Sequence, residues 1–203
     1  MSQCLKRVEA VRAFRLKSTR IATINSADKP TRFQTENMPT SNYLVIPEVS
    51  SEKRQYVPIG FMSPNVLCSN LVRLIPNATL YHFGILTSSV HMAWMRMVCG
   101  RLETRYRYSK DIVYNNFPWP TPTPAQQQKI EHTAQAILDA RALYPDSSLA
   151  DLYNETTMPP ELRQAHRDND RAVLKAYGFA STLAEAEIVT KLFVLYEALA
   201  KQV

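Results

Sequence analysis

Glycine is scarce in this 203-residue chain, and its four copies lie far apart. They are Gly60, Gly84, Gly100 and Gly178, and no two are within ten residues of each other. A dinucleotide fingerprint, a P-loop or another glycine-rich cofactor loop needs clustered glycines, because only they let backbone come close to phosphate or ribose. None of these loops can be built from this sequence, so we expect no nucleotide-type cofactor to be held here.

Composition indicates a folded protein of a reducing compartment. Hydrophobic residues make up 45% of the chain and charged residues 21%, which is typical of globular domains. The three cysteines, Cys4, Cys68 and Cys99, are odd in number and widely spaced, which predicts free thiols. No apolar run reaches the roughly 18 residues of a membrane span, and the N-terminus has no continuous apolar stretch of the secretory type. We therefore expect no membrane partner.

Charge is distributed unevenly along the chain. Residues 1–120 contain 16 Lys and Arg against 7 Asp and Glu, whereas residues 121–203 contain 8 against 11. A basic half of this size is typical of a polyanion binder, and nucleic acid is the first candidate. The alternative is a protein-interaction module whose basic surface is incidental and merely solvated.

A proline-rich stretch divides the two halves. The segment FPWPTPTP at 117–124 has four prolines in eight residues, which favours a stiff, extended connector. The sequence thus predicts an α+β fold, with a basic, mixed α/β domain over 1–120 and a small helical domain over 121–203.

The first domain combines helix and strand patterns. Apolar spacing predicts a helix over 3–17 and polar composition a loop over 24–42. Two β-branched and aromatic runs, 43–49 and 56–62, predict two strands joined by a charged turn.

The remainder of this domain has shorter patterns. We expect short strands or loops over 65–75 and 79–86, and a helix over 87–98 with Gly100 just beyond its end. The segment 101–109 alternates charged and aromatic side chains, which favours a strand or an extended recognition loop.

The second domain is helical. Thr123 and Pro124 predict the start of one helix, residues 148–153 a short helical turn, and Gly178 the end of a helix that opens at Pro159-Pro160. Thr182 and Glu185 have the spacing of a capping box. It predicts a last helix with four inward-facing residues, Ile188, Leu192, Leu195 and Leu199.

No catalytic or metal-binding constellation is visible. The four histidines, at 82, 91, 132 and 166, have no metal-ligand spacing, and GxSxG and HExxH are absent. The segment NNFPWP at 115–120 superficially resembles the Asn-Pro-Pro-aromatic tetrapeptide of amino-group DNA methyltransferases, but its prolines alternate with aromatics. We interpret it as a packed aromatic-proline plug and expect no enzymatic activity of this chain on its own.

Four segments are informative as whole stretches, and in the third of them RYRYS followed by YNNFPWP is far more specific than any short nucleotide motif. They are CLKRVEAVRAFRLKS (4–18), YLVIPEVSSEKRQYVPIGF (43–61), VHMAWMRMVCGRLETRYRYSKDIVYNNFPWP (90–120) and MPPELRQAHRDNDRAVLKAYGF (158–179). They resemble the C-terminal part of MmeI-like type II restriction-modification proteins. In that family one polypeptide carries a nuclease, a helical connector, an adenine-N6 methyltransferase, a target-recognition domain and a C-terminal helical domain. The resemblance covers almost the whole chain and implies its last two parts.

The resemblance also implies partners and cofactors. The chain would bind double-stranded DNA beside an upstream methyltransferase domain of the same polypeptide, in a bacterial or archaeal cytoplasm. It would itself hold no cofactor and no metal, while the parent enzyme would use S-adenosylmethionine and, if it is a nuclease, Mg²⁺.

By the same resemblance, base readout falls to a few side chains. Glu103 and Arg105 lie two residues apart, and on an extended segment both would point the same way. Glutamate accepts from cytosine N4 and arginine donates to guanine O6 and N7, so the pair suits one C·G base pair. Arg107 would read a neighbouring pair. The alternative for these three is a surface ion-pair ladder.

A second implied group of base readers is Glu48 with Asn70 and Leu71; the alternative for Glu48 and Asn70 is loop capping. Phosphate contacts would set affinity and salt dependence. Their candidates are the basic residues Lys6, Arg7, Arg12, Arg15, Lys17, Arg20, Lys53, Arg54, Arg73 and Arg101.

Overall fold

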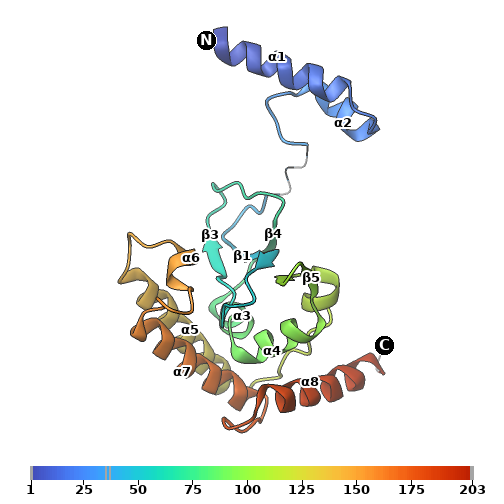
Figure 1. Ribbon diagram of the computed structural model, residues 1–203. Coiled ribbons are helices and arrows are strands. Elements are labelled where there is room, and N and C mark those ends of the chain that lie inside the picture. Colours follow the sequence, from blue (N-terminus) through green and yellow to red (C-terminus); the bar gives the residue numbers. More distant parts are fainter. Residues whose placement is uncertain (1, 35, 37, 202–203) are drawn as a thin grey trace. The chain divides into compact units, whose positions relative to one another are not determined.

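The computed structural model describes residues 2–34, 36 and 38–201, which fold into two compact units, 1–38 and 39–203. The first unit contains α1 (Ser2–Leu16), α2 (Ile21–Asn25) and the 3₁₀ turn η1 (Ser26–Asp28). The helix expected over 3–17 is confirmed, whereas part of the loop expected over 24–42 is helical. Figure 1 shows α1 beside α2.

Arg15 connects the two parts of the first unit. Its guanidinium donates to the carbonyl oxygens of Ser26 (2.8 Å), Lys29 (2.9 Å) and Arg32 (2.7 Å). Ala27 is 1% exposed, while Phe14 on α1 is 76% exposed. These three bonds join the end of α1 to the segment after it, in a unit where little apolar surface is buried.

Two small antiparallel sheets form in the second unit. Sheet A has the order β3 (Gly60–Met62), β1 (Tyr43–Pro47), β4 (Val72–Pro76), and sheet B the order β2 (Val49–Ser50), β6 (Arg105–Arg107), β5 (Gly100–Leu102). The strands expected over 43–49 and 56–62 are confirmed in part as the antiparallel pair β1 and β3. The first run is interrupted at Glu48, and in the second only 60–62 is strand. Since Glu48 is the single residue between the end of β1 and the start of β2, the chain passes from sheet A to sheet B there.

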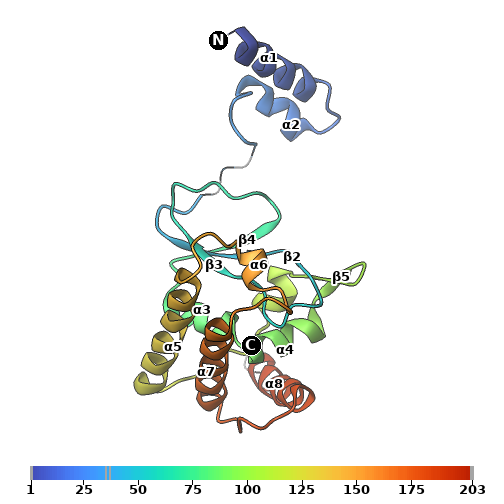
Figure 2. The same ribbon diagram turned by 60° about the vertical axis from the view of Figure 1, so that its left-hand side comes forward.

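The helices of the second unit lie mostly below the sheets in the views of Figure 1 and Figure 2. They are α3 (Leu80–Leu86), α4 (Ser89–Val98), the π-helical turn η2 (Lys110–Tyr114), α5 (Pro124–Ala142), α6 (Leu149–Leu152), α7 (Pro160–Ala176) and α8 (Glu185–Ala200). Helix α5 packs along α7 and α3, and α4 packs against α8. The expected α+β class is confirmed.

The expectation of strands or loops over 79–86 is wrong, because this segment is helix α3. The Thr79 backbone N–H donates to Nδ1 of His82 at 3.2 Å, which caps the helix start. Phe83 to Leu86 are all buried, so the helix is apolar on most sides and has no helical period to read. At Gly84 a Cβ atom would lie 2.7 Å from Ile130, which shows how closely α3 approaches α5.

The helix starts in the second half are mostly as expected. Thr123 caps α5 with Pro124 in its first turn, and Gly178 follows α7 with a φ of 69°. The capping box expected at Thr182 and Glu185 is wrong: α8 begins at Glu185, and Glu187 accepts from the Ala184 backbone N–H at 2.8 Å.

The inward face expected for α8 is only half correct. Ile188 and Leu192 are buried, whereas Leu195 and Leu199 are 37% and 48% exposed. The first half of α8 therefore packs on the core, and its second half carries apolar side chains at the surface.

Candidate nucleic-acid interface

Glu48 is the point where the two sheets join. Its backbone N–H donates to the Leu71 carbonyl at 2.9 Å, which extends the β1–β4 pairing by one residue. Its carbonyl accepts from the Tyr108 backbone N–H at 2.7 Å, just beyond β6. One residue thus brings together three segments that are distant in the sequence.

The Glu48 side chain lies between two arginines. Oε2 accepts from Nη2 of Arg73 at 3.0 Å, and Oε1 accepts from Nε of Arg107 at 3.3 Å. The Glu48 side chain is only 10% exposed, against 37% for Arg73 and 58% for Arg107. A carboxylate this shielded is stabilised by its two cations, so in this structure Glu48 faces protein groups, neither solvent nor a loop backbone.

The segment expected to be extended is a hairpin of β5 and β6. Arg105 and Arg107 are exposed on one face of β6, while Tyr106 between them is buried. Glu103 lies in the turn with a φ of 57°. The expectation that Glu103 and Arg105 share a face of one extended strand is therefore wrong, because the turn places Glu103 in the left-handed region.

Glu103 and Arg105 nevertheless meet. Nη2 of Arg105 donates to Oε2 of Glu103 at 2.7 Å, and the two side chains are 45% and 75% exposed respectively. This is the surface ion pair that was the alternative for these residues. It also keeps a carboxylate and a guanidinium together at the tip of the hairpin.

Asn70 and Leu71 form the turn that leads into β4, and both are exposed. The Leu71 backbone N–H donates to the Ser69 hydroxyl at 3.3 Å, which fixes the turn. Glu48 thus bonds to both Leu71 and Arg107, Glu103 pairs with Arg105 on the same strand as Arg107, and Asn70 precedes Leu71 in the turn. We call this set the junction surface: Glu48, Asn70, Leu71, Glu103, Arg105 and Arg107.

Buried aromatic side chains hold the hairpin from below, and sequence reasoning did not assign them this role. The Tyr108 hydroxyl lies 3.0 Å from Nε2 of His91 on α4, and the ring of Phe117 stands edge-on to His91 at 4.6 Å. Burial lowers the pKa of His91 to about 3 and raises the pKa of Tyr108. Both groups are therefore neutral near pH 7 and serve packing.

The expected aromatic-proline plug is confirmed, since Phe117 is 3% exposed and Trp119 packs edge-on against it.

The phosphate-contact candidates have different environments. Lys53 is exposed, and with Arg54 it lines a depression of about 280 Å³ after β2. Arg101 stacks over the ring of Tyr106 at 4.3 Å, on the hairpin face opposite Arg105.

Arg73 is the candidate that pairs with Glu48 of the junction surface. The exposed Arg12 and the engaged Arg15 belong to the first compact unit, as do four further candidates that are all exposed: Lys6, Arg7, Lys17 and Arg20.

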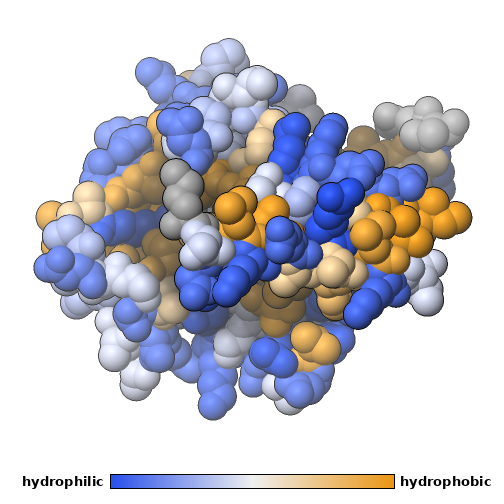
Figure 3. Space-filling model, turned by 90° about the horizontal axis from the view of Figure 1, so that it is seen from above, coloured by the Kyte–Doolittle hydropathy of each residue, from blue (hydrophilic) through white to orange (hydrophobic). Residues whose placement is uncertain are grey.

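Large apolar side chains are exposed in both compact units. Figure 3 shows apolar patches separated by hydrophilic side chains on the face that it draws. In the second unit, the largest exposures at the end of α4 and along α8 are 60% for Met97 and 63% for Val194. The junction surface is by contrast rich in charge.

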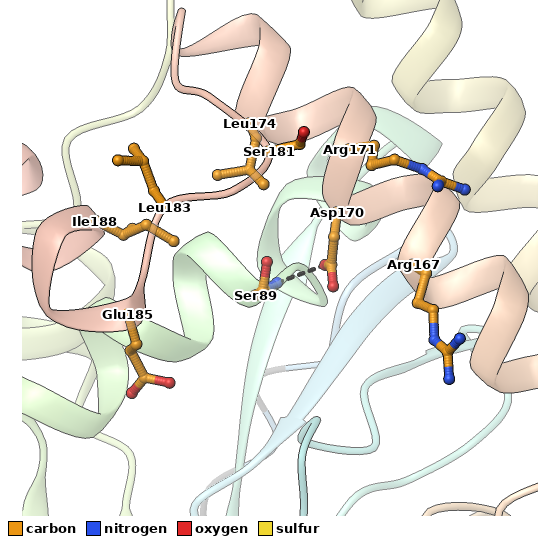
Figure 4. Close-up of a pocket in the computed structure, with 9 residues that line it drawn as sticks. All are labelled: Ser89, Arg167, Asp170, Arg171, Leu174, Ser181, Leu183, Glu185 and Ile188. Atoms are coloured by element: carbon orange, nitrogen blue, oxygen red, sulfur yellow. Dashed lines mark hydrogen bonds between the residues drawn. The ribbon is translucent and has the colours of Figure 1, made fainter.

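A depression of about 440 Å³ lies between α7, α8 and the start of α4 (Figure 4). At its inner wall the Asp170 carboxylate accepts from the Ser89 backbone N–H and from the Tyr56 hydroxyl, both at 2.7 Å. Burial raises the pKa of Asp170. Since both of its oxygens hold structural bonds, Asp170 fastens α7 to α4 and to the loop before β3.

Residues 2–34, 36 and 38–201 contain neither a metal-ligand cluster nor an apolar helix of membrane-spanning length. No group of three or more His, Cys, Asp or Glu side chains is placed there to hold a metal ion. None of the helices in that part of the chain is long and apolar enough to cross a membrane. Cys4, Cys68 and Cys99 are free thiols, as expected.

Comparison with known proteins identifies the family. Residues 1–121 match the model of the MmeI target recognition domain, and residues 122–203 match that of the MmeI C-terminal domain. DNA methyltransferase A of Bacillus subtilis (strain 168) is 39% identical over 191 residues, which are 93% of this chain and 22% of that protein.

A solved structure is also similar. The Type IIL restriction-modification enzyme MmeI, determined in complex with DNA, is 47% identical with a TM-score of 0.92. The match covers 98% of this chain and 26% of that one, so the chain spans about a quarter of the length of these relatives. The chain belongs to the MmeI family, whose target recognition domain it carries.

Proposed function

We propose that this chain recognises a specific sequence in duplex DNA and acts as the target-reading part of an adenine-N6 DNA methyltransferase of the restriction-modification type. The observation that carries this proposal is the convergence of three distant segments on the junction surface. Exposed ion pairs contribute little to stability, so a gathering of arginines and carboxylates at the sheet junction favours a binding role. Charged donors and acceptors of these types would suit the edges of base pairs.

The chemistry of the junction surface suits the major groove. Arg107 donates to Glu48 through Nε, so its two terminal nitrogens remain available for guanine O6 and N7. Arg105 also offers guanidinium donors, although its Nη2 already donates to Glu103, and Glu103 offers an acceptor for cytosine N4. Asn70 would serve adenine, or other bases singly. Leu71, which is 59% exposed, would contact the apolar part of a base edge.

Affinity would come from the basic half of the chain. Residues 1–120 carry nine more basic than acidic side chains, which favours a polyanion over other partners. Lys53 and Arg54 follow Glu48 by five and six residues, Arg101 precedes Glu103 by two, and Arg12 belongs to the first compact unit. These contacts would orient the duplex without selecting its sequence.

Catalysis would belong to another part of the parent enzyme. The four glycines lie in or beside β3, α3, β5 and the end of α7, and a Cβ at Gly84 or Gly60 would meet packed side chains. The described residues therefore do not fit S-adenosylmethionine, whose loops need clustered glycines. We assign this methyl donor, and Mg²⁺ for any nuclease, to a preceding methyltransferase or nuclease part. This chain would then position the duplex so that the methyltransferase can flip an adenine, in a bacterial or archaeal cytoplasm.

A titration of labelled duplex with the full 203-residue chain tests the proposal. We expect binding at low salt. The logarithm of the association constant should fall steeply and linearly with the logarithm of the salt concentration, because counterions are released from DNA. Unlabelled duplexes of varied sequence should compete unequally. No binding at low salt, or equal competition by every sequence, would contradict the proposal.

A further inference from the structure

We propose that Arg73 is a positioning residue that sets sequence preference through Glu48 and Arg107, and that it is not a phosphate contact. This inference rests on the proposed function, because it concerns how the junction surface presents its donors. It differs from the expectation drawn from the sequence, where Arg73 was one of several interchangeable basic residues.

Arg73 is turned toward protein. It lies on β4 opposite Ile46 of β1, and its Nη2 donates to Glu48 Oε2 at 3.0 Å. The Nε atom of Arg73 is buried, and no hydrogen-bond partner for it is found among the described residues. A guanidinium that is bound to a shielded carboxylate and partly desolvated has lost much of its freedom to follow a phosphate.

Glu48 transmits this restraint to the hairpin. Its second oxygen, Oε1, accepts from Nε of Arg107 at 3.3 Å, and β6 places Arg107 opposite Val49. Because each arginine donates to one oxygen of the carboxylate, Glu48 accepts from Arg107 through Nε only. The outer fork of Arg107, 58% exposed as a side chain, is then the part that can read guanine bidentately.

Removal of Arg73 should change this geometry in a defined way. Glu48 is 10% exposed, so its carboxylate would seek a replacement donor instead of staying half-paired. Arg107 is the cation already in contact, and a two-bond carboxylate–guanidinium pair would occupy one of its terminal nitrogens. Preference at the base pair that Arg107 reads should therefore fall, while contacts elsewhere persist.

Lys53 provides the matched control. It is exposed, is a candidate phosphate contact, and its loss removes the same single charge as the loss of Arg73. A phosphate contact lowers affinity for all sequences about equally and reduces the salt slope by about 1, whereas a base-reading defect relaxes preference at one position. The two roles thus predict different outcomes for Arg73.

The experiment selects binders from a pool of randomised duplexes with the full chain and sequences the enriched pool. The variants are Arg73→Met, Arg73→Lys and the control Lys53→Met, each checked for folding by circular dichroism. We expect Arg73→Met to reduce preference roughly tenfold at a single base-pair position, with an unchanged salt slope. Arg73→Lys, which keeps a cation beside Glu48, should restore most of that preference.

Lys53→Met should keep the same enriched sequence with weaker binding overall. Uniform weakening and a shallower salt slope in Arg73→Met would overturn the inference but leave the proposed function standing. A wild-type chain that enriches no sequence would overturn the proposed function itself. If Arg73→Met does not fold, Arg73→Gln, which also removes the cation, gives the same comparison.

Discussion

Exchange of charge at the hairpin tip should invert one recognised base pair. The variant Glu103→Lys with Arg105→Asp reverses an ion pair whose atoms lie 2.7 Å apart and whose side chains are 75% and 45% exposed. Exposed pairs of this kind contribute about 0–1 kcal/mol to stability, and the reversed pair keeps the attraction. We therefore expect the variant to fold with nearly unchanged stability.

The effect on recognition should be much larger. A good contact to a base edge discriminates by about 1–3 kcal/mol, which corresponds to roughly 5- to 150-fold in relative affinity. Glutamate and arginine favour C·G in one orientation, and aspartate and lysine in exchanged places favour the opposite orientation. Preference between a selected duplex and its single-pair inversion should change sign.

Competition between these two duplexes, followed by fluorescence anisotropy, measures the change. The single variant Glu103→Lys is the control: it places two cations side by side, so it should lose the preference without inverting it. An unchanged preference in the double variant, with binding retained, would refute the assignment of this pair to a base.

Three further changes test the structure that supports the interface. Gly84→Ala should lower the free energy of unfolding by about 1–3 kcal/mol, because its methyl group would lie 2.7 Å from a side chain of α5. Gly60→Ala, whose methyl group would have its nearest contact at 3.5 Å, is the control. Equal urea midpoints for the two variants would contradict the close packing of α3 on α5. Burial lowers the pKa of His91 to about 3, so the free energy of unfolding should fall as pH drops from about 6.5 toward 3, by about 1.4 kcal/mol at pH 5.5. The variant His91→Phe should have a flatter profile of stability against pH. A profile identical to that of the wild type would show that His91 is not the group responsible. Arg15→Met removes three bonds to backbone carbonyls and should speed trypsin cleavage within the first compact unit; Arg12→Met should not.

Local signals in the sequence predicted the helical half best. Thr123 with Pro124 and Gly178 mark helix ends through their own backbone chemistry, which tertiary packing did not override. The predicted start of α8 was misplaced because Glu185 and Glu187 both offer a carboxylate near the helix start. In the structure it is Glu187 that accepts from the backbone N–H of Ala184. Its outer face was misjudged because spacing shows which residues align, not how far the core extends.

Helix α3 could not be predicted from periodicity. It is short, it is buried on most sides, and its sequence has the apolar continuity of a buried strand. The closest clue was Thr79, three residues before His82, a spacing that caps the helix through an imidazole instead of a carboxylate.

The candidate interface was predicted as residues but not as geometry. Family resemblance named the six junction-surface positions, yet nothing in the sequence showed that Glu48 is shielded between two arginines. That arrangement depends on the register of β1 with β4 and of β2 with β6. The left-handed turn at Glu103 was also missed, because glutamate rarely adopts a positive φ and no glycine marks the position.

Hydrogen–deuterium exchange of the full chain, with and without a duplex that it selects, tests the central claim most directly. Binding should slow exchange over three separate segments, 48–50, 70–73 and 100–108, since these form and support the junction surface. Segments of α5, α7 and α8 should exchange as they do in the free chain. Protection confined to those helices, with the three junction segments unchanged, would contradict the account.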